Sequence, residues 1–466
     1  MMPEDKQKQL HNLLRGSLSP FIQKAFHEVN PGQPFFDSWY LDAMAHKLEQ
    51  CRVRDCKRLI ITLPPRMLKS IVASVAYPAF LLGRNPTERI LCISYSHEVT
   101  QKHARDFRRV VASAWYRQVF PKTVALRSVE DIFETTRHGF RRSGSFGGAQ
   151  TGLGASTIIV DDAMKADEAL QKSQREKAND YFANTLYSRL DRKTNGVIIV
   201  VMQRLHDEDL VGYLLRQGGW EHLCLPAIAV QDEQIPIGDC QFHHRKKGEL
   251  LNPEFEPLSS LEATKRIMGT MHFQAQYQQA PIPESGNLIK LDWIKYFQSP
   301  PPRADARIVQ SWDTAQKGGE VHDYAVGTTW LHAEGKHFLI DVVREQCDYP
   351  TLSRLVLEQY GKHQPDALLI EDHGSGTGLI ADLKKCHSIG AIPIKPTRDK
   401  IVRLSIVSPM FERGEIFVPQ NAHWLVDFLD ELLRFPQARF DDQVDSVTQY
   451  LNWHRGGTTL FEVFWT

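Results

Sequence analysis

The sequence has few cysteines, no long apolar run and no excess of charge of either sign. Its seven cysteines, among 466 residues, include no CxxC pair, so we expect reduced thiols and no disulfide framework. Cys224 and Cys240 lie near His243 and His244 in the sequence, but their spacing fits no zinc-finger pattern. The longest apolar stretch, residues 71–82, has about half the length that a membrane span needs. We therefore expect a soluble intracellular protein without a membrane segment, and 42% hydrophobic residues are enough to exclude a disordered chain.

The balanced net charge conceals two halves of opposite sign. The whole chain carries 56 Lys and Arg against 56 Asp and Glu. Residues 1–285 carry 37 basic and 32 acidic residues, and residues 286–466 carry 19 and 24, so the halves are +5 and −5. A balanced total therefore does not exclude binding to a nucleic acid. It predicts that the first half offers the basic surface and that the second half needs bound cations to approach a polyanion.

The alternation of apolar and polar segments predicts two α/β domains joined by a connector. Residues 57–225 alternate short β-rich runs with helical ones, which is typical of a parallel sheet covered by helices on both faces. Residues 226–286 are rich in proline and predict an irregular connector with one helix near residues 259–279. In residues 287–466 the pattern predicts three consecutive strands, then a helix, a further strand and more helices. This order is typical of a mixed sheet. In the first domain the expected strands are residues 59–63, 89–94, 157–160 and 197–202, and the expected helices are residues 69–82, 97–116, 168–190 and 207–216.

A phosphate-binding loop is predicted between the first strand and the first helix of the first domain. Its sequence is Leu63-Pro64-Pro65-Arg66-Met67-Leu68-Lys69-Ser70. A strand, a tight loop and a Lys-Ser pair that opens a helix point backbone N–H groups at phosphates. The lysine would neutralise phosphate oxygens, and the serine hydroxyl would hold Mg²⁺. Leu63 and Leu68 stand where the consensus has glycine, so an ordinary strand-to-helix turn is the alternative.

Polar residues also end two later strands of the same expected sheet. Asp161 and Asp162 follow one strand, where a nucleotide hydrolase needs one carboxylate to hold Mg²⁺ and a neighbour to orient water. A capped strand end is the alternative. Gln203 and Arg204 follow the other strand and would sense the γ-phosphate. Because the carboxyl ends of parallel strands meet at one edge of a sheet, we expect both pairs beside the loop.

Two basic groups each have a functional and a structural interpretation. Arg141 and Arg142 precede a glycine-rich run, which could offer an arginine finger to the γ-phosphate of a neighbouring subunit or could be a mobile loop. Lys102, Arg105 and Arg109 share one face of an expected helix, which could contact a DNA backbone or could be a solvated face.

Acidic residues follow the expected elements of the second domain. Asp313 ends the first of its strands, Glu371 ends a later one, and Asp442 and Asp445 lie three residues apart on one face of a final helix. Carboxylates that converge in this way can hold the pair of divalent cations that cleaves a phosphodiester. This order of strands and carboxylates is the ribonuclease-H-like nuclease layout. The glycines of the GSGTG segment, residues 374–378, lack dinucleotide-binding spacing and predict a flexible loop beside the metal site.

Together these segments resemble the large terminase subunit of tailed bacteriophages and prophages, over roughly residues 35–455. The resemblance rests on an ordered series of segments: PFFDSWYLDAMAHKL, PPRMLKS, RILCISYSHEVTQKHARDFR, TIIVDDAMKADEA, VVMQRLHDEDLVGYLL, FQAQYQQAPIPESG, the Asp313 strand, LLIEDHGSGTG and DDQVDSV. It implies an α/β fold in which a P-loop ATPase domain of the ASCE type, residues 57–225, precedes a ribonuclease-H-like nuclease domain, residues 287–466. Residues 1–56 would be a helical segment and a lid on the adenine side.

The resemblance also implies a role for each candidate residue. Asp162 would be the catalytic carboxylate, although the family more often has Asp-Glu than Asp-Asp here, and Gln203 and Arg204 would couple hydrolysis to motion. ATP with Mg²⁺ would be bound by Pro65, Arg66, Met67, Leu68, Lys69, Ser70 and Asp161, and two divalent cations, Mg²⁺ or Mn²⁺, would be bound by Asp313, Glu371 and Asp445, with Asp442 as a close candidate.

The function implied by the resemblance is a viral DNA-packaging motor. ATP hydrolysis would drive double-stranded DNA into a procapsid, and the nuclease would cut concatemeric DNA. The implied partners are double-stranded DNA, the portal protein, the small terminase subunit and further copies of the chain in a ring, all in the cytoplasm of a bacterial host. The alternatives are a stand-alone ATP-dependent nuclease-helicase of repair or defence, and a non-hydrolysing scaffold that only binds DNA or portal.

Overall fold

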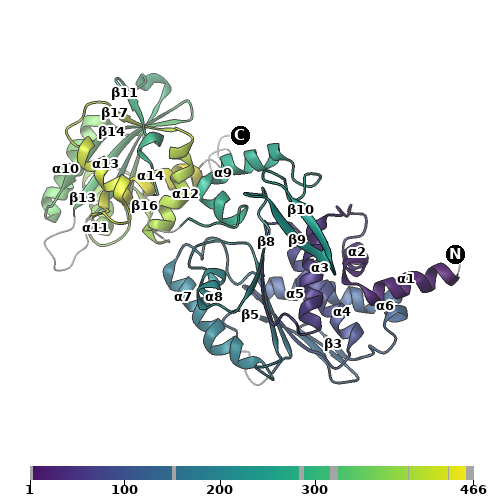
Figure 1. Ribbon diagram of the computed structural model, residues 1–466. Coiled ribbons are helices and arrows are strands. Elements are labelled where there is room, and N and C mark those ends of the chain that lie inside the picture. The colour runs from purple at the N-terminus through teal and green to yellow at the C-terminus, as the bar shows by residue number, and fades with distance from the viewer. Residues whose placement is uncertain are drawn as a thin grey trace. The chain divides into compact units, whose positions relative to one another are not determined.

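The computed structural model in Figure 1 describes residues 4–148, 154–282, 288–314, 324–396, 398–438 and 440–457. The chain divides into two compact units, Met1–Pro283 and Glu284–Thr466. The expected boundary between connector and nuclease domain, at residues 286 and 287, lies outside the described residues. Among the described residues, none of the helices combines the length and the apolar character needed to cross a membrane.

A largely parallel sheet forms the centre of the first unit. Its strands follow the order β3-β4-β5-β2-β6-β7-β1-β8, in which β3 and β4 are antiparallel to their neighbours and all other pairs are parallel. Strand β7, which ends just before Gln203, lies between β1 and β6. The predicted phosphate-binding loop follows β1, and Asp161 ends β6, so both lie beside the end of β7. The bounds are β1 Arg58–Thr62, β2 Arg89–Ser94, β3 Ala125–Val129, β4 Ile132–Thr135, β5 Phe140–Ser145, β6 Thr157–Asp161, β7 Val197–Met202 and β8 Glu221–Cys224.

Helices cover both faces of this sheet, as its uninterrupted apolar strands require. One face packs on the amino-terminal helices and on α4, α5 and α6 in a single apolar core. The other face packs on α7, η2 and α8. The bounds are α1 Glu4–Gly16, α2 Leu18–Val29, α3 Trp39–Arg52, η1 Ile71–Ala76, α4 Tyr77–Arg84, α5 His97–Ala112, α6 Ala114–Val119, α7 Lys172–Tyr181, η2 Phe182–Leu186, η3 Tyr187–Arg189 and α8 Leu210–Gln217.

The segment expected to be an irregular connector contains regular structure. A hairpin of β9, Glu233–Gly238, and β10, Gln241–Arg245, precedes the expected helix α9, Leu258–Gln276. The Arg245 guanidinium is buried, donates hydrogen bonds to the Pro226 and Glu249 carbonyls, and lies over the Trp39 ring. The hairpin therefore packs on α3 and belongs to the first compact unit.

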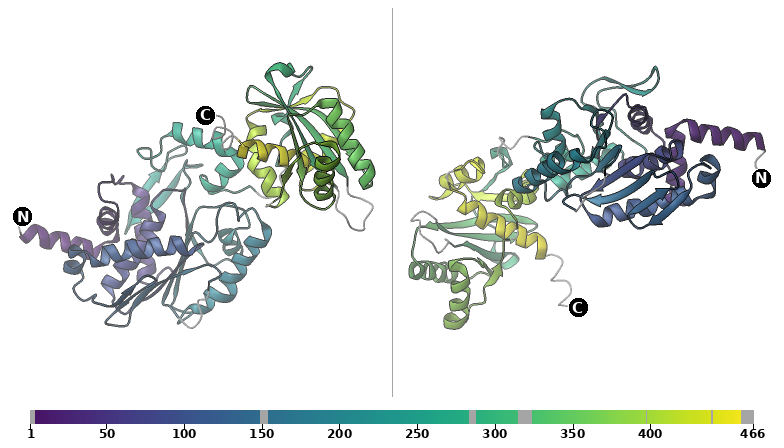
Figure 2. Two further views of the ribbon diagram at one scale, coloured as in Figure 1. Left: turned by 180° about the vertical axis from the view of Figure 1, so that it is seen from behind. Right: turned by 90° about the horizontal axis from the view of Figure 1, so that it is seen from below.

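A seven-stranded mixed sheet forms the second unit, in the order β11-β17-β14-β13-β12-β15-β16. Figure 2 shows its helices on both faces: α12, α13 and α14 share one core with the central strands, and α10 and α11 share the other. The antiparallel run β12-β13-β14 followed by the parallel strand β15 confirms the ribonuclease-H-like layout. The bounds are η4 Leu291–Trp293, β11 Lys295–Phe297, η5 Arg303–Asp305, β12 Arg307–Asp313, β13 Ala325–Ala333, β14 Lys336–Glu345, α10 Tyr349–His363, β15 Ala367–Glu371, α11 Ser375–His387, β16 Ile392–Ile394, α12 Lys400–Glu412, β17 Ile416–Pro419, α13 Leu425–Arg434 and α14 Asp442–Gly457.

A buried ion pair connects the end of β7 to the start of α8. The Arg204 Nε donates to both carboxylate oxygens of Asp209 at 3.1 Å, and the Arg204 Nη2 donates to the His206 carbonyl at 3.1 Å. Asp209 also caps α8 by accepting a hydrogen bond from the Gly212 backbone N–H at 2.9 Å. The Asp209 carboxylate therefore both neutralises the buried Arg204 charge and accepts a hydrogen bond from a free backbone N–H at the start of α8.

Removing the Asp209 carboxylate is expected to destabilise the first unit. Asp209→Ala leaves the Arg204 guanidinium buried and unpaired, which costs about 3–5 kcal/mol in free energy of unfolding. Urea unfolding followed by fluorescence measures the change. Asp207, whose side chain is 44% exposed, provides the control, and Asp207→Ala should change this free energy by less than about 0.5 kcal/mol. Equal effects of the two variants would contradict the role given to the ion pair.

Candidate functional site

The loop after β1 adopts a turn that usually requires glycine. Arg66 has φ 66° and Leu68 has φ 56°, both in the left-handed region. Leu68, which stands at a consensus glycine position, packs its side chain against the apolar core of the unit. Met67 is buried in the same core, whereas Pro65, Arg66 and Leu68 line a cavity. Leucine at position 68 is therefore compatible with a tight loop, because packing holds a backbone conformation that its side chain disfavours.

Lys69 lies where the ends of two neighbouring strands meet. Its ammonium group donates to the Gln203 Oε1 at 2.5 Å and lies 3.3 Å from the Asp162 Oδ2. Its side chain is only 8% exposed, so the charge lies largely out of solvent. The three residues come from the loop and from the ends of β6 and β7. The structure thus brings together Lys69, Asp162 and Gln203, which the sequence predicts at one sheet edge.

Ser70 and Asp161 form the second part of this site. The Ser70 hydroxyl donates to the Asp161 Oδ1 at 3.0 Å, and the Ser74 hydroxyl donates to Oδ2 at 2.7 Å. Burial raises the pKa of Asp161, while these two hydroxyls and the Lys69 charge act in the opposite direction. A serine hydroxyl beside a carboxylate is an all-oxygen donor pair of the kind that Mg²⁺ prefers. These two residues therefore fit a magnesium ion.

His103 of α5 is a site residue that the sequence did not predict. Its Nδ1 lies 3.5 Å from the Asp161 Oδ2, and its side chain lines the cavity. Burial lowers the pKa of His103 to about 4, and the positive charge of Arg141 adds to this effect. The ring is therefore neutral at neutral pH. A single histidine inside an amphipathic helix gives no sequence signal for such a contact.

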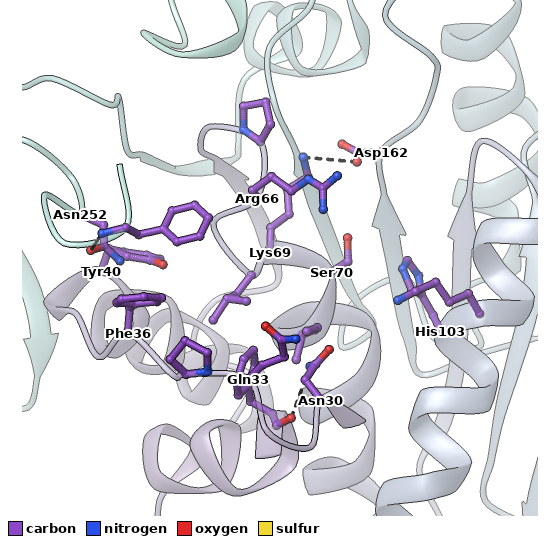
Figure 3. Close-up of a pocket in the computed structure, with 17 residues that line it drawn as sticks. Asn30, Gln33, Phe36, Tyr40, Arg66, Lys69, Ser70, His103, Asp162 and Asn252 are labelled. Atoms are coloured by element: carbon purple, nitrogen blue, oxygen red, sulfur yellow. Dashed lines mark hydrogen bonds and ion pairs between the residues drawn. The ribbon is translucent and has the colours of Figure 1, made fainter. Parts of the chain in front are cut away.

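A cavity of about 670 Å³ opens beside the loop. In Figure 3 Lys69, Ser70, Asp162 and His103 lie on one side of it, and Phe36, Tyr40 and Asn252 lie on another. The rings of Phe36 and Phe255 lie 5.7 Å apart. Burial raises the pKa of Tyr40 to about 12, so its hydroxyl keeps its proton. A polar, charged side and an aromatic side in one cavity match the two ends of a nucleotide.

Two predicted basic groups do not face this cavity. Arg204 pairs with Asp209 and is not among the residues that line the cavity. Arg141 and Arg142 lie in strand β5 and not in a loop. Arg141 is 2% exposed, donates to the Ser74 carbonyl at 3.1 Å and lies over the Phe107 ring, so it is an internal residue and not a finger for a neighbouring subunit. The strand was missed because its polar sequence, FRRSGS, resembles a loop.

The basic face of α5 is present on the surface. Lys102, Arg105 and Arg109 are exposed, and Lys102 pairs with Asp106 at 3.1 Å. Lys102 also lines the cavity. Its exposure is consistent with both interpretations, DNA contact and simple solvation.

The predicted nuclease carboxylates converge in the second unit. Strands β12 and β15 are parallel neighbours with Trp312 opposite Ile370, so Asp313 and Glu371 end them side by side. Helix α14 is tied to β12 because Ser311 and Ser446 exchange two hydrogen bonds of 2.8 Å between hydroxyl and carbonyl. Burial raises the pKa of Asp313 well above its ordinary value, and the nearby carboxylates of Asp445, Glu371 and Asp442 raise it further. Such mutual repulsion is the condition that a bound divalent cation relieves.

Helix α12 supplies two cations that the sequence did not predict. Lys400 Nζ lies 2.7 Å from the Asp445 Oδ2, and the Arg403 Nη2 donates to its Oδ1 at 2.7 Å. Burial raises the pKa of Asp445 to about 6, although both cations act in the opposite direction. The only signal in the sequence is the spacing of three residues between Lys400 and Arg403, which places them on one helix face.

The GSGTG segment is not a flexible loop. Gly374, with φ 55°, precedes α11, and Ser375–Thr377 form the first turn of that helix. A Cβ on Gly376 would lie 2.0 Å from the Glu371 carbonyl oxygen, so this glycine permits the helix to approach the end of β15. The segment therefore positions Glu371.

Known proteins share this architecture. Residues 310–453 match the family model of the terminase RNaseH-like domain. The chain resembles the large terminase of a thermophilic bacteriophage, solved in several crystal forms, at 13% identity and a TM-score of 0.51 over 90% of this chain and 99% of that chain. The HK97 bacteriophage large terminase aligns at 11% identity and a TM-score of 0.38 over 90% and 96% of the two chains. No curated relative matches the sequence. The family model and the first of these structures confirm the predicted fold, an ATPase-like α/β unit followed by a ribonuclease-H-like unit.

A β-branched residue at position 68 is expected to weaken nucleotide binding. Leu68→Ile keeps the side-chain volume but disfavours a positive φ by about 1–1.5 kcal/mol, so ADP should bind about tenfold more weakly. Isothermal titration calorimetry measures the affinity. Leu68→Met is the control, because it is unbranched at Cβ and should bind ADP as the unaltered chain does. Equal affinities for Leu68→Ile and the unaltered chain would contradict the importance of this backbone conformation.

An added methyl group at Gly376 is expected to impair DNA cleavage. Gly376→Ala must push Glu371 away from its neighbours, and a displacement of about 1 Å can reduce a rate about 100-fold. Gly378→Ala is the control, because its Cβ would meet only the Tyr349 side chain, at an ordinary contact distance of 3.6 Å or more. Plasmid cleavage with Mg²⁺ or Mn²⁺ provides the measurement, and circular dichroism checks the fold. Full cleavage by a folded Gly376→Ala protein would remove Glu371 from the site.

Proposed function

We propose that this chain, whose residues 310–453 match the terminase RNaseH-like domain, is the large subunit of a viral DNA-packaging terminase. The observation that carries the proposal is the pairing of two separate sites in one chain. Lys69 contacts Asp162 and Gln203 in the first unit, and in the second unit three further carboxylates lie near enough to Asp313 to raise its pKa. The first set suits phosphoryl transfer from a nucleotide, and the second suits metal-assisted cleavage of a phosphodiester.

The residues of the first unit divide the work of ATP hydrolysis. Lys69 would neutralise phosphate oxygens, and Ser70 and Asp161 would hold Mg²⁺, which would supply further positive charge to the phosphates. Asp162 would orient the attacking water. Gln203 accepts a hydrogen bond from Lys69, so a shift of Lys69 on phosphate binding or release would be passed to the end of β7. The aromatic side of the cavity, with Phe36 and Phe255, receives the base. Support for this assignment comes from the position of all these groups around one cavity and one sheet edge.

The residues of the second unit form a nuclease site. Asp313 and Glu371, with Asp445 or Asp442 as the third ligand, would hold two divalent cations, Mg²⁺ or Mn²⁺, whose charge would lower the pKa of a bound water and stabilise a leaving oxygen. Lys400 and Arg403 orient Asp445.

The remaining parts of the proposal concern partners. The motor moves double-stranded DNA, docks as a homo-oligomeric ring on the portal protein, and receives DNA from the small terminase subunit in the cytoplasm of a bacterial host. The exposed basic face with Lys102, Arg105 and Arg109 is a candidate surface for the DNA backbone. A stand-alone nuclease-helicase would have the same two sites but no portal partner. A non-hydrolysing scaffold would show no DNA-stimulated ATP turnover.

Two single substitutions should separate the two activities. Lys69→Ala removes the phosphate-side charge and should lower DNA-stimulated ATP turnover at least about 100-fold while leaving DNA cleavage intact. Asp313→Asn keeps the side-chain shape but removes a metal-ligand charge, and should abolish cleavage while ATP turnover stays near that of the unaltered chain. Phosphate release and plasmid cleavage measure the two rates. The exposed residues Lys122 and Asp427 provide the controls Lys122→Ala and Asp427→Asn.

Three outcomes would overturn the proposal. Normal ATP turnover by Lys69→Ala would exclude the loop as the hydrolytic site. Loss of both activities in a folded Asp313→Asn protein would exclude two independent sites. The absence of DNA-stimulated ATP turnover in the unaltered chain would favour the scaffold.

A further inference from the structure

Three histidines meet in the second unit, away from the carboxylates described above. His332 of β13 and His337 of β14 are cross-strand partners, and His454 comes from the last turns of α14. The ring centres of His332 and His454 lie 4.2 Å apart, those of His337 and His454 4.7 Å, and those of His332 and His337 4.9 Å. One ring nitrogen from each histidine lies within 4.8 Å of the other two. No other group of three His, Cys, Asp or Glu side chains with this spacing occurs among the described residues.

The cluster lies at the opposite end of the sheet from the nuclease carboxylates. His332 is opposite Arg307, the first residue of β12, whereas Asp313 is the last residue of that strand. Six residues along a strand correspond to about 20 Å. Helix α14 spans the same interval, because Asp445 lies in its first turn and His454 nine residues later, about 13 Å along the helix axis. The histidines therefore form a separate site.

The three imidazole rings are neutral at neutral pH. Burial lowers the pKa of His337 to about 3 and that of His332 to about 4, and the positive charge that a protonated His454 would carry contributes to both. Burial, and next the positive charge of Arg307, also lower the pKa of His454. Neutral imidazoles keep the lone pairs that a transition metal requires.

Tyr450 is a hydrogen-bond partner of one of the three histidines. Its hydroxyl lies 2.8 Å from the His337 Nδ1, and its ring stacks on Trp330 at 4.8 Å. The phenol is buried, and burial raises its pKa, so it stays neutral. When it accepts a hydrogen bond from the His337 Nδ1–H, the Nε2 of that ring is left unprotonated. Such outer partners commonly fix the tautomer of a histidine that binds metal.

We propose that His332, His337 and His454 bind one transition-metal ion of the zinc class, which links the β13–β14 hairpin to the carboxyl-terminal end of α14. Three histidines are a complete protein ligand set for a tetrahedral Zn²⁺ whose fourth position is open. His332 and His454 are partly exposed, so solvent can supply the fourth ligand. Nitrogens bound to one such ion lie about 3.4 Å apart, so binding requires the rings to close by about 1 Å. Nitrogen ligands discriminate against Mg²⁺, which prefers oxygen, so Mg²⁺ would not occupy this site.

Zinc binding to the full chain tests this site directly. The protein is made without a histidine tag, stripped with chelator and titrated with Zn²⁺ in excess Mg²⁺, all in the Asp313→Asn background so that the carboxylates contribute little. Calorimetry should give one bound Zn²⁺ per chain. Co²⁺ in place of Zn²⁺ should give the strong visible absorption of a four-coordinate site and not the weak absorption of six oxygen ligands.

Substitutions within and outside the cluster identify the ligands. His332→Gln and His454→Gln, at partly exposed positions, should each weaken binding more than 100-fold. Tyr450→Phe should weaken it about 10- to 100-fold, as for other outer partners of metal-binding histidines. His423→Gln, at an exposed histidine outside the cluster, should bind Zn²⁺ unchanged. Circular dichroism of the metal-free proteins shows whether each variant folds.

Several results would overturn the proposal. The absence of a bound Zn²⁺ in the folded Asp313→Asn protein would do so without any cluster variant. Unchanged affinity in the doubly substituted His332→Gln, His454→Gln protein would place the ion elsewhere. Neither result bears on the proposed packaging function, which the Lys69 and Asp313 variants test separately.

Discussion

Both units depend on the compensation of buried carboxylates by cationic side chains at the carboxyl edge of a sheet. In the first unit Lys69 lies against Asp162, next to the buried Asp161. In the second unit Lys400 and Arg403 together hold Asp445. A buried charge without a partner is strongly destabilising, so each sheet edge can keep its carboxylates only because neighbouring elements deliver these cations. Carboxylates gathered in this way attract divalent cations, and the neighbouring cationic side chains attract phosphates, so both edges are suited to binding the two together.

Packing and backbone conformation hold the first edge in place where the sequence departs from its usual pattern. Leucine is unfavourable at positive φ, yet at Leu68 the side chain contacts the same apolar core as Met67 and Ile71. The cost of a single left-handed residue, about 1–2 kcal/mol, is comparable to the gain from burying a leucine side chain. A loop of this sequence can therefore present Lys69 and Ser70 without glycine. The missing glycines weakened the prediction from sequence but do not argue against the geometry.

The features that could be predicted from the sequence are those encoded in short stretches of it, such as apolar strands and the polar residues that follow them. The apolar runs of β1, β2, β6 and β7 and the polar residues that follow them predicted the central sheet and placed Lys69, Asp161, Asp162 and Gln203 at one edge. Arg141 and Arg204 were misjudged, because whether an arginine faces a ligand or is buried depends on distant partners such as Phe107, or on a side-chain rotation toward Asp209. Lys400, Arg403, Asn252 and Phe255 were missed for the same reason: each reaches its site only through long-range packing. Periodicity indicates which face of a helix is buried, but not which carboxylate it meets.

The contacts along helix α14 fix the position of the nuclease carboxylates that it carries. Its first turn carries Asp442 and Asp445, its middle is fixed to β12 through Ser446 and Gln449, and its last turns carry His454. A helix held at three places has little freedom to shift along its axis, so the position of Asp445 relative to Asp313 depends on the whole length of α14. Because Lys400 and Arg403 also belong to a helix packed on α14, the carboxylate and its counter-ions are fixed by the same contacts. Precise placement of the carboxylates thus follows from packing far from the chemistry, which is why residues at the other end of the sheet can influence it.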